Sequence, residues 1–225
     1  MTERKTLFIT GASSGIGAAT ARAAVAAGWN VGLMARSADK LKALADDLGD
    51  ACVSVPGDAT DLAAQEAAMA RIADHFGGID AAFANAGKGV TTTGTETGNP
   101  DEWREMIDLN IMALLYTSRA ALPHLRKTRG HLLLTGSVAG KIHIPGSIYG
   151  ATKWFVHGYA GNMAQEMREW GGRCTLIAPG MVDTPFFSEP KPDKLKAEDI
   201  AEAVIYAMSQ PTRANVQEVV VMPTG

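Results

Sequence analysis

The sequence is poor in cysteine and has no long apolar run. Its two cysteines, Cys52 and Cys174, are far apart, which argues against a disulfide framework and agrees with a reducing compartment. No stretch approaches the roughly 18 apolar residues needed to span a bilayer. The first ten residues, MTERKTLFIT, lack the longer apolar region and cleavage site of a secretory signal. These absences predict a cytoplasmic protein with no membrane partner.

An excess of basic charge is missing as well. Charged residues make up 20% of the chain and the net charge is −3, so there is no electrostatic footprint for nucleic acid. Histidine pairs at zinc-site spacing, with each other or with cysteine, are also absent. We therefore expect neither a nucleic-acid partner nor a metal. The histidines are at positions 75, 124, 131, 143 and 157.

What the chain does contain is a regular alternation of short apolar runs with longer amphipathic segments. Its 225 residues suit one large domain, which we expect over residues 1–225. Continuous apolar strands are typical of a sheet covered on both faces. The pattern predicts an α/β fold with a parallel sheet of about seven strands and helices on both faces. The expected strands are residues 6–10, 30–35, 52–57, 80–85, 131–136, 174–179 and 219–223.

Alanine-rich segments of helical period lie between these strands. Several of them end at a glycine where the chain has to turn, for example Gly49 and Gly77. The polar, proline-punctuated residues 191–199 are interpreted as a loop, within a short substrate loop at about 181–199. The expected helices are residues 15–28, 37–49, 61–77, 102–125 and a segment that begins at Tyr149.

A glycine-rich turn follows the first expected strand, where TLFIT leads into GASSGIG and then into a helix. A sharp strand-to-helix turn needs residues without a Cβ atom, and it directs the N–H groups of the helix N-terminus at an anion. The spacing of Gly11, Gly15 and Gly17 differs from the commonest dinucleotide fingerprint, G-x-G-x-x-G. Because the flanking strand and helix are in place, the turn still predicts a site for a dinucleotide pyrophosphate.

The same residues also satisfy G-x-S-x-G, the pattern of a hydrolase nucleophile elbow, with Ser13 at its centre. An elbow needs an earlier strand and loop to supply part of the oxyanion hole. Only ten residues precede Gly11, so a hydrolase is disfavoured.

The end of the second expected strand indicates which dinucleotide binds. A carboxylate there accepts hydrogen bonds from the ribose 2′-hydroxyl, whereas a guanidinium pairs with a 2′-phosphate. Here the strand is followed by Arg36 and Ser37, and the nearest acid, Asp39, lies in the first turn of the next helix. The helix dipole is reason enough for an acid at that place. NADP(H) is therefore predicted in preference to NAD(H), which remains an alternative.

Further motifs follow in order along the chain. They are TGASSGIG (10–17), GDATD (57–61), ANAG (84–87), Asn110 within DLNIMALL, Ser137 within LLLTGSVAG, YGATK (149–153) and PGMVDT (179–184). Each motif is weak by itself, but the ordered series resembles the short-chain dehydrogenase/reductase family over essentially the whole chain. One departure is Ala84, which stands where the family's NNAG motif has its first Asn.

This resemblance implies a Rossmann-type, doubly wound sheet of order 3-2-1-4-5-6-7 and a nicotinamide cofactor. It also implies a catalytic tetrad of Asn110, Ser137, Tyr149 and Lys153. Tyr149 would be the acid/base, Lys153 its pKa modifier and a ribose ligand, Ser137 the orienting hydroxyl, and Asn110 the anchor of a water in the proton path.

The resemblance further implies that Asp58 meets the adenine and that residues 179–184 approach the nicotinamide. The residues expected to contact the cofactor are Gly11, Ser13, Ser14, Gly15, Ile16, Gly17, Arg36, Ser37, Asp58, Ala59, Asn85, Ala86, Gly87, Tyr149, Lys153, Pro179, Gly180, Val182 and Thr184.

Physical chemistry gives an independent reason for Tyr149 and Lys153. Hydride transfer between a nicotinamide and a carbonyl leaves charge on the carbonyl oxygen, so a proton donor is needed there. A free tyrosine has a pKa of about 10, and a nearby cation lowers it. Positions four apart on a helix share a face, so Lys153 is expected beside Tyr149. We therefore predict an NADP(H)-dependent oxidoreductase that interconverts a carbonyl and a secondary alcohol.

The segments expected to line the substrate pocket, residues 88–94, 138–148 and 181–192, are mostly apolar. A small alcohol or ketone with an apolar body is therefore the expected substrate. Three basic side chains could hold a carboxylate and so leave an anionic substrate open. They are Lys88, Lys141 and His143.

Two helical segments, residues 103–122 and 149–170, carry apolar residues on more than one face. The corresponding helices often pair between subunits in the family that the chain resembles. A homodimer or homotetramer is therefore expected.

Two other functions remain as alternatives: a non-catalytic NADP(H)-binding regulatory protein and an NAD-dependent hydroxy-acid dehydrogenase. A regulator predicts loss of Tyr149 or Lys153, and both are present. An extended-family epimerase or dehydratase would need a larger C-terminal domain, and a divergent enoyl reductase would normally have a wider Tyr–Lys spacing. Both are disfavoured.

Overall fold

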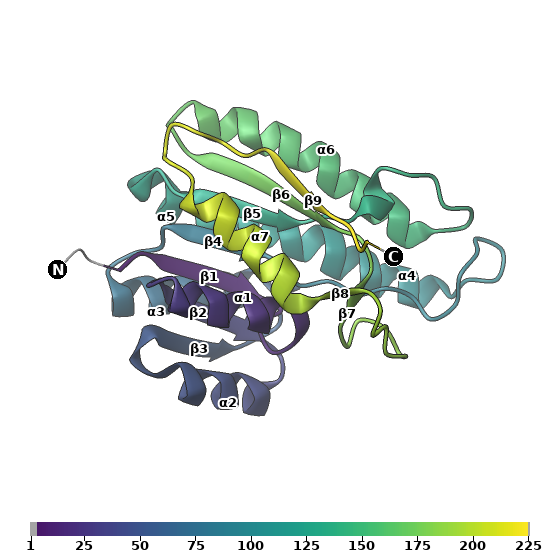
Figure 1. Ribbon diagram of the computed structural model, residues 1–225, viewed down its shortest axis with the longest axis horizontal. Helices are drawn as coiled ribbons and strands as arrows, with labels where there is room; N and C mark the ends of the chain where they lie inside the picture. The colour runs from purple at the N-terminus through teal and green to yellow at the C-terminus, as the bar shows by residue number, and fades with distance from the viewer. Residues whose placement is uncertain (1–3, 225) are drawn as a thin grey trace.

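The computed structural model describes residues 4–224, so residues 1–3 and 225 of the expected domain lie outside the described part. Its centre is a seven-stranded sheet of order β3-β2-β1-β4-β5-β6-β9 (Figure 1). Every neighbouring pair in this sheet is parallel. Since β9 is the seventh strand of the sheet along the chain, the order confirms the expected 3-2-1-4-5-6-7.

The seven strands lie where the apolar runs predict them, within one or two residues at their ends. Alternate side chains of a strand point to opposite faces. Phe8 accordingly packs in one core and its neighbours Leu7 and Ile9 in the other. The strands are β1 (Thr6–Thr10), β2 (Asn30–Ala35), β3 (Cys52–Pro56), β4 (Ala81–Ala84), β5 (His131–Thr135), β6 (Arg173–Pro179) and β9 (Glu218–Val221).

Helices cover both faces of the sheet, each contributing an apolar stripe to one of the two cores (Figure 1). One face is covered by α1 (Gly15–Ala26), α2 (Ala38–Leu48) and α7 (Ala197–Ser209). The other is covered by α3 (Leu62–Phe76), α5 (Ala113–Thr128) and α6 (Ile148–Arg168). Two short 3-10 turns are η1 (Gly49–Ala51) and η3 (Val138–Gly140).

The single helix expected over residues 102–125 is interrupted. It consists of α4 (Pro100–Ile107), a π-helical segment η2 (Asp108–Met112) and α5. A π turn accommodates one extra residue and is found mostly as a single turn within α-helices, often at functional sites. Apolar periodicity is too coarse to separate the two hydrogen-bonding patterns over five residues, so the sequence did not indicate the change.

The segment interpreted as a loop up to residue 199 is shorter and more ordered than expected. Its ends pair as two parallel strands, β7 (Val182–Asp183) and β8 (Leu195–Lys196), and α7 begins directly at Ala197. The Asp199 carboxylate accepts a hydrogen bond of 2.8 Å from the Lys196 N–H, which satisfies a donor at the helix start. The acidic residues counted as loop therefore belong to the first turn of a helix.

Within residues 4–224, no helix has both the length and the apolar character that a membrane crossing requires.

The buried environment of His131, at the start of β5, predicts how the free energy of unfolding responds to acid. Thr175 Oγ1 donates to Val216 O and lies 2.7 Å from His131 Nε2, so Nε2 is the donor in that pair. His131 Nδ1 is buried and has no partner among the described residues. Burial, with Arg173 nearby, lowers the pKa of His131 from 6.5 to about 3. A proton on Nδ1 would have no acceptor.

We expect the free energy of unfolding to fall as pH drops below 6.5, because the unfolded chain then binds a proton that the folded chain resists. The slope from this group is about 1.4 kcal/mol per pH unit. Chemical denaturation of wild type and His131→Leu at a series of pH values measures it. The variant should show a shallower loss towards acid; equal slopes would contradict a neutral, buried His131.

Candidate active site

A cavity of about 680 Å³ lies at the carboxyl ends of the parallel strands, where ligands bind in open α/β sheets. Segments from β1 through to the residues after β6 contribute to its wall. It is lined by all the predicted site residues except Gly17 and Asn110. The predicted residues that line the cavity are Gly11, Ser13, Ser14, Gly15, Ile16, Arg36, Ser37, Asp58, Ala59, Asn85, Ala86, Gly87, Ser137, Tyr149, Lys153, Pro179, Gly180, Val182 and Thr184.

The glycine turn forms a cradle at the N-terminus of α1. Gly11 has φ +65°, and a Cβ on Gly17 would lie 2.4 Å from the Gly11 carbonyl oxygen, so both positions need glycine. Gly17 thus packs against the Gly11 carbonyl and does not itself line the cavity. Asn85 Nδ2 donates to Thr10 O at 3.1 Å and steadies the turn. Ser14, the N-cap of α1, makes no side-chain hydrogen bond to the helix. A pyrophosphate fits this arrangement of backbone donors.

Two cations and one carboxylate line the far end of the cavity. Arg36 and Lys40 both line the cavity, and Arg36 lies close enough to Asp58 for their charges to interact. A hydrogen bond from Thr60 N to Asp58 Oδ1, 2.9 Å long, lowers the pKa of Asp58, and Arg36 contributes to the same direction. Lys40 was not among the predicted residues. Its place in the first turn of the helix after Arg36 could have suggested it.

The start of α6 brings Tyr149 and Lys153 to Ser137. Ser147 caps the helix by accepting from Gly150 N at 2.9 Å. Ser137 caps η3: its Oγ accepts from Ala139 N at 3.1 Å. Tyr149, Lys153 and Ser137 therefore meet in one wall, although Ser137 comes from a different element.

Lys153 Nζ lies 5.7 Å from the centroid of the Tyr149 ring and donates to Thr135 O at 2.9 Å. Burial raises the pKa of Tyr149, and a hydrogen bond with Ser137 lowers it in part. Burial also lowers the pKa of Lys153 to about 8. The expected lowering of the Tyr149 pKa is therefore not what this structure shows, because the loss of water around the phenol is the larger effect.

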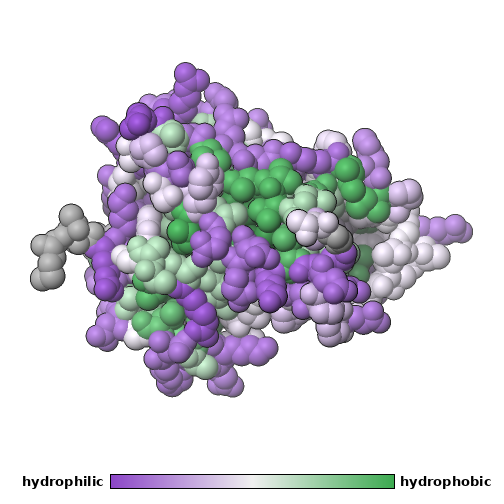
Figure 2. Space-filling view, viewed as in Figure 1, coloured by the Kyte–Doolittle hydropathy of each residue, from purple (hydrophilic) through white to green (hydrophobic). Residues whose placement is uncertain are grey.

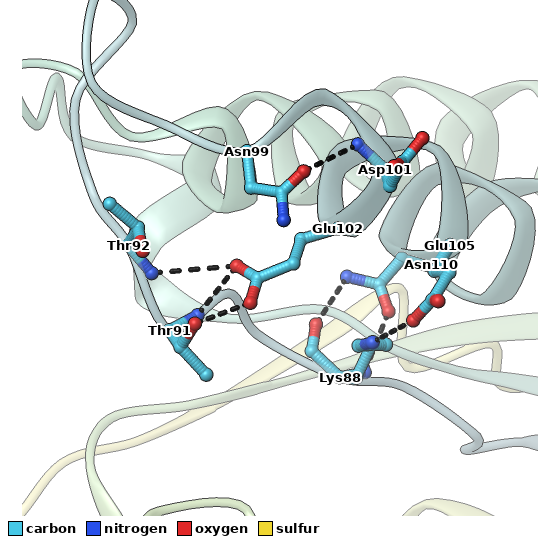
Figure 3. Close-up of polar contacts among 8 residues, drawn as sticks. All are labelled: Lys88, Thr91, Thr92, Asn99, Asp101, Glu102, Glu105 and Asn110. Atoms are coloured by element: carbon cyan, nitrogen blue, oxygen red, sulfur yellow. Dashed lines mark hydrogen bonds and ion pairs between the residues drawn. The ribbon is translucent and has the colours of Figure 1, made fainter.

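Asn110 lies behind the wall of the cavity, in the π-helical segment, and is 1% exposed. Its Oδ1 accepts from Lys88 N at 2.9 Å, and its Nδ2 donates to Lys88 O at 2.9 Å (Figure 3). The same Nδ2 also donates to Thr152 Oγ1 at 3.2 Å. The side chain therefore joins the loop after β4 to helix α6. This is the packing role of a buried Asn, and it fixes the loop beside the cavity.

The same loop is held by two carboxylates of α4. Glu102 accepts hydrogen bonds from Thr91 and Thr92, and Glu105 forms an ion pair of 2.6 Å with Lys88 Nζ (Figure 3). Val90, within this loop, lines the cavity. Helix α4 thus positions one wall of the cavity.

Known proteins resemble this chain in sequence and in structure. Residues 5–195 match the short chain dehydrogenase family. An uncharacterised oxidoreductase of Staphylococcus aureus is 39% identical over 225 residues, 97% of each chain.

Two solved structures share the fold over nearly the full length. The alcohol dehydrogenase of the archaeon Thermococcus sibiricus, complexed with 5-hydroxy-NADP, has 31% identity and a TM-score of 0.91, covering 99% of this chain and 97% of its own. The serine dehydrogenase of Escherichia coli has 30% identity and a TM-score of 0.88, covering 97% of both chains.

Proposed function

The chain belongs to the short chain dehydrogenase family of oxidoreductases, and on that premise we propose that it interconverts a carbonyl and a secondary alcohol with NADP(H). The observation that carries this proposal is the meeting of Ser137, Tyr149 and Lys153 in the same cavity as the glycine cradle. When bound, the nicotinamide supplies or accepts the hydride.

In the direction of reduction, Tyr149 holds the proton that the carbonyl oxygen receives. Its raised pKa keeps the phenol protonated at neutral pH, which is the form a general acid needs. Ser137 supplies a second hydroxyl that fixes the oxygen. Lys153, still charged below its pKa of about 8, stabilises negative charge that develops on the phenol oxygen.

The NADP preference is proposed from Arg36, because a guanidinium suits a 2′-phosphate. Two observations support it: Arg36 and Lys40 line the same end of the cavity, and the Thermococcus relative binds an NADP derivative.

We expect Arg36→Ala to raise the KM for NADPH by about 10-fold to 100-fold, the loss of a charge-assisted hydrogen bond, and to leave the KM for NADH nearly unchanged. Steady-state kinetics with both cofactors checks this. Lys42→Ala is the matched control, since it removes a cation of the same helix, α2, that does not line the cavity. If the ratio of the KM for NADPH to the KM for NADH is unchanged in Arg36→Ala, Arg36 does not recognise the phosphate.

The substrate is proposed to be neutral and apolar at the end nearest Tyr149. Lys88 Nζ is paired with Glu105 at 2.6 Å, and Lys141 Nζ with Glu218 at 2.7 Å. His143 stacks on Trp154 with ring centroids 5.3 Å apart. The three basic side chains that left an anionic substrate open are thus engaged in other contacts.

Apolar and small side chains line that end instead, and the Phe186 ring lies 5.6 Å from the Tyr149 ring, centroid to centroid. Apart from Lys153, the described residues of this wall include no Lys, Arg or His. The apolar and small residues of the wall are Gly89, Val90, Thr93, Leu109, Val138, Gly146, Ser147, Met181, Pro185, Phe186 and Phe187.

Oxidation of NADPH and NADH by the purified protein, over ketones, aldehydes, a β-keto ester and its matching β-keto acid, tests this function. Turnover of the ester and not of the acid is expected. Turnover of the acid alone would point to the second candidate, a hydroxy-acid dehydrogenase, which the likeness to serine dehydrogenase supports. Tight NADPH binding without turnover of any carbonyl would favour a regulatory protein.

A homodimer or homotetramer is also proposed. Members of the family are typically oligomeric, and Leu115, Leu122, Tyr159 and Met163 line a surface hollow between α5 and α6. Figure 2 shows more apolar surface in the region of α7 and β9, where Val220 and Met222 are 45% and 56% exposed. Light scattering at micromolar concentration should give an oligomer; a monomer would overturn the proposal.

A further inference from the structure

Helix α6 carries a third polar side chain on the face that holds Tyr149 and Lys153. His157 lies four residues beyond Lys153 and eight beyond Tyr149, so the three side chains project from one side of the helix. The side chain of His157 is 14% exposed and does not line the cavity. None of the roles proposed above uses it.

The imidazole of His157 lies against the loop that carries Ser137. Its Nε2 is 2.9 Å from the Ser137 carbonyl oxygen. Because a carbonyl oxygen can only accept, Nε2 carries the hydrogen and donates it.

Two glycines on either side of Ser137 make room for this ring. A Cβ on Gly140 would lie 2.6 Å from His157 Cδ2, and a Cβ on Gly136 would lie 3.2 Å from His157 Nε2. The backbone before and after Ser137 therefore follows the shape of the imidazole.

The other edge of the ring faces strand β9. His157 Nδ1 lies 3.8 Å from Glu218 Oε1, and Glu218 pairs with Lys141, the residue that follows η3. The ring is thus held between the catalytic helix, the Ser137 loop and the edge strand.

The Ser137 hydroxyl needs such support. Its Oγ accepts from Ala139 N at 3.1 Å, but its hydrogen bond to Pro179 O is long, at 3.5 Å. Apart from its hydrogen bond with Tyr149, the position of the hydroxyl therefore depends on where the backbone of the loop lies.

We propose that His157 is a positioning residue: its hydrogen bond to the Ser137 carbonyl fixes the loop so that the Ser137 hydroxyl faces Tyr149 and the reacting oxygen. This inference rests on the proposed carbonyl chemistry of the site. It extends the Tyr–Lys face of α6 by one more turn, to a residue that acts through Ser137 and touches neither substrate nor cofactor.

The test compares His157→Leu with His157→Gln. Leucine removes the donor, whereas the glutamine amide nitrogen reaches the place of Nε2 and restores it. We expect His157→Leu to lower kcat by about 10-fold to 100-fold, as small misplacements of catalytic groups do, with an unchanged Kd for NADPH. His157→Gln should recover most of the loss.

A double-mutant cycle identifies the route of the effect. If His157 acts through Ser137, then adding His157→Leu to Ser137→Ala should lower kcat no further. A second loss as large as the one in the wild-type background would overturn the proposal, and so would an unchanged kcat in His157→Leu alone.

A readout without turnover separates this proposal from the proposed function. Ultraviolet titration of the protein without cofactor, with a matched Tyr149→Phe sample subtracted, follows the phenolate of Tyr149. Since hydrogen bonding to Ser137 lowers the pKa of Tyr149, His157→Leu should raise that pKa further and His157→Gln should not.

A wild-type protein that turns over no carbonyl would count against the proposed function alone, and the titration would still decide the role of His157. An unchanged Tyr149 pKa in His157→Leu would overturn it. If His157→Leu does not fold, His157→Asn replaces it, because the shorter amide mimics Nδ1 and cannot reach the Ser137 carbonyl.

Discussion

Tyr149→Phe is expected to lower kcat for ketone reduction by about 10³-fold while the Kd for NADPH changes little. The substitution removes one oxygen atom and leaves the ring in place against Phe186, where the two ring centroids are 5.6 Å apart. The shape of the pocket is therefore retained and the proton donor is lost. Stopped-flow oxidation of NADPH, with binding followed by fluorescence, measures both quantities.

Ser137→Ala is the matched control for this prediction, because it also deletes one hydroxyl from the same wall. It should cost less, since Ser137 orients the oxygen and does not transfer the proton. Tyr149→Phe with more than a tenth of wild-type kcat would mean that another group or water supplies the proton.

Lys153→Met is expected to make the protein at least as stable as wild type and nearly inactive. Lys153 is 5% exposed, and burial lowers its pKa from 10.5 to about 8. The charged form is therefore costly in the folded state, by about 3 kcal/mol at neutral pH. Methionine has a similar length and no charge, so it removes this cost.

One interaction opposes the gain. Lys153 Nζ donates to Thr135 O at 2.9 Å, and methionine leaves that carbonyl without this donor, at a cost of about 1 to 3 kcal/mol. We expect a net rise of about 0 to 2 kcal/mol in the free energy of unfolding at pH 7, and a melting temperature higher by up to about 8 °C. In Lys153→Met, kcat should also fall by about 10²-fold, because the cation that stabilises the phenol oxygen is gone.

The sign of the pH dependence provides a further check. The unfolded chain binds more protons than the folded chain between the two pKa values of Lys153, so stability from this group rises with pH from about 8 to 10.5. Wild-type kcat for reduction should fall over the start of that range, as Lys153 loses its charge. The stability advantage of Lys153→Met should shrink there as well. A variant less stable than wild type at pH 7 would show that the hydrogen bond to Thr135 outweighs the cost of the buried charge.

Asn110 illustrates where inference from the sequence stops. The motif that contains it was found from the sequence, and the family resemblance implied that it anchors a water. The structure places its side chain on the Lys88 backbone and on Thr152, with a π turn around it. Neither the turn nor those partners follows from local pattern, because Lys88 is 22 residues away and Thr152 is 42 residues away.

His157 and Lys40 were missed for a related reason. His157 sits on the helix of Tyr149 and Lys153, and Lys40 on the helix that follows Arg36, but neither belongs to a motif. What singles them out is a neighbour: the Ser137 carbonyl for His157 and the cavity wall beside Arg36 for Lys40. Lys88 and Lys141 were considered as ligands for an anion, and their carboxylate partners on α4 and β9 became visible only in three dimensions.

Local sequence patterns were enough to predict the layered α/β fold, the glycine cradle and the alignment of Tyr149 with Lys153. All three depend on residues close together in the chain, where period, turn chemistry and helix geometry leave little freedom. The three-dimensional arrangement was needed to show which cations are paired, that Asn110 lies behind the wall and that burial dominates the pKa values of Tyr149 and Lys153. Pairing and desolvation depend on groups brought together from distant parts of the chain and on the water they displace, and no local pattern records either.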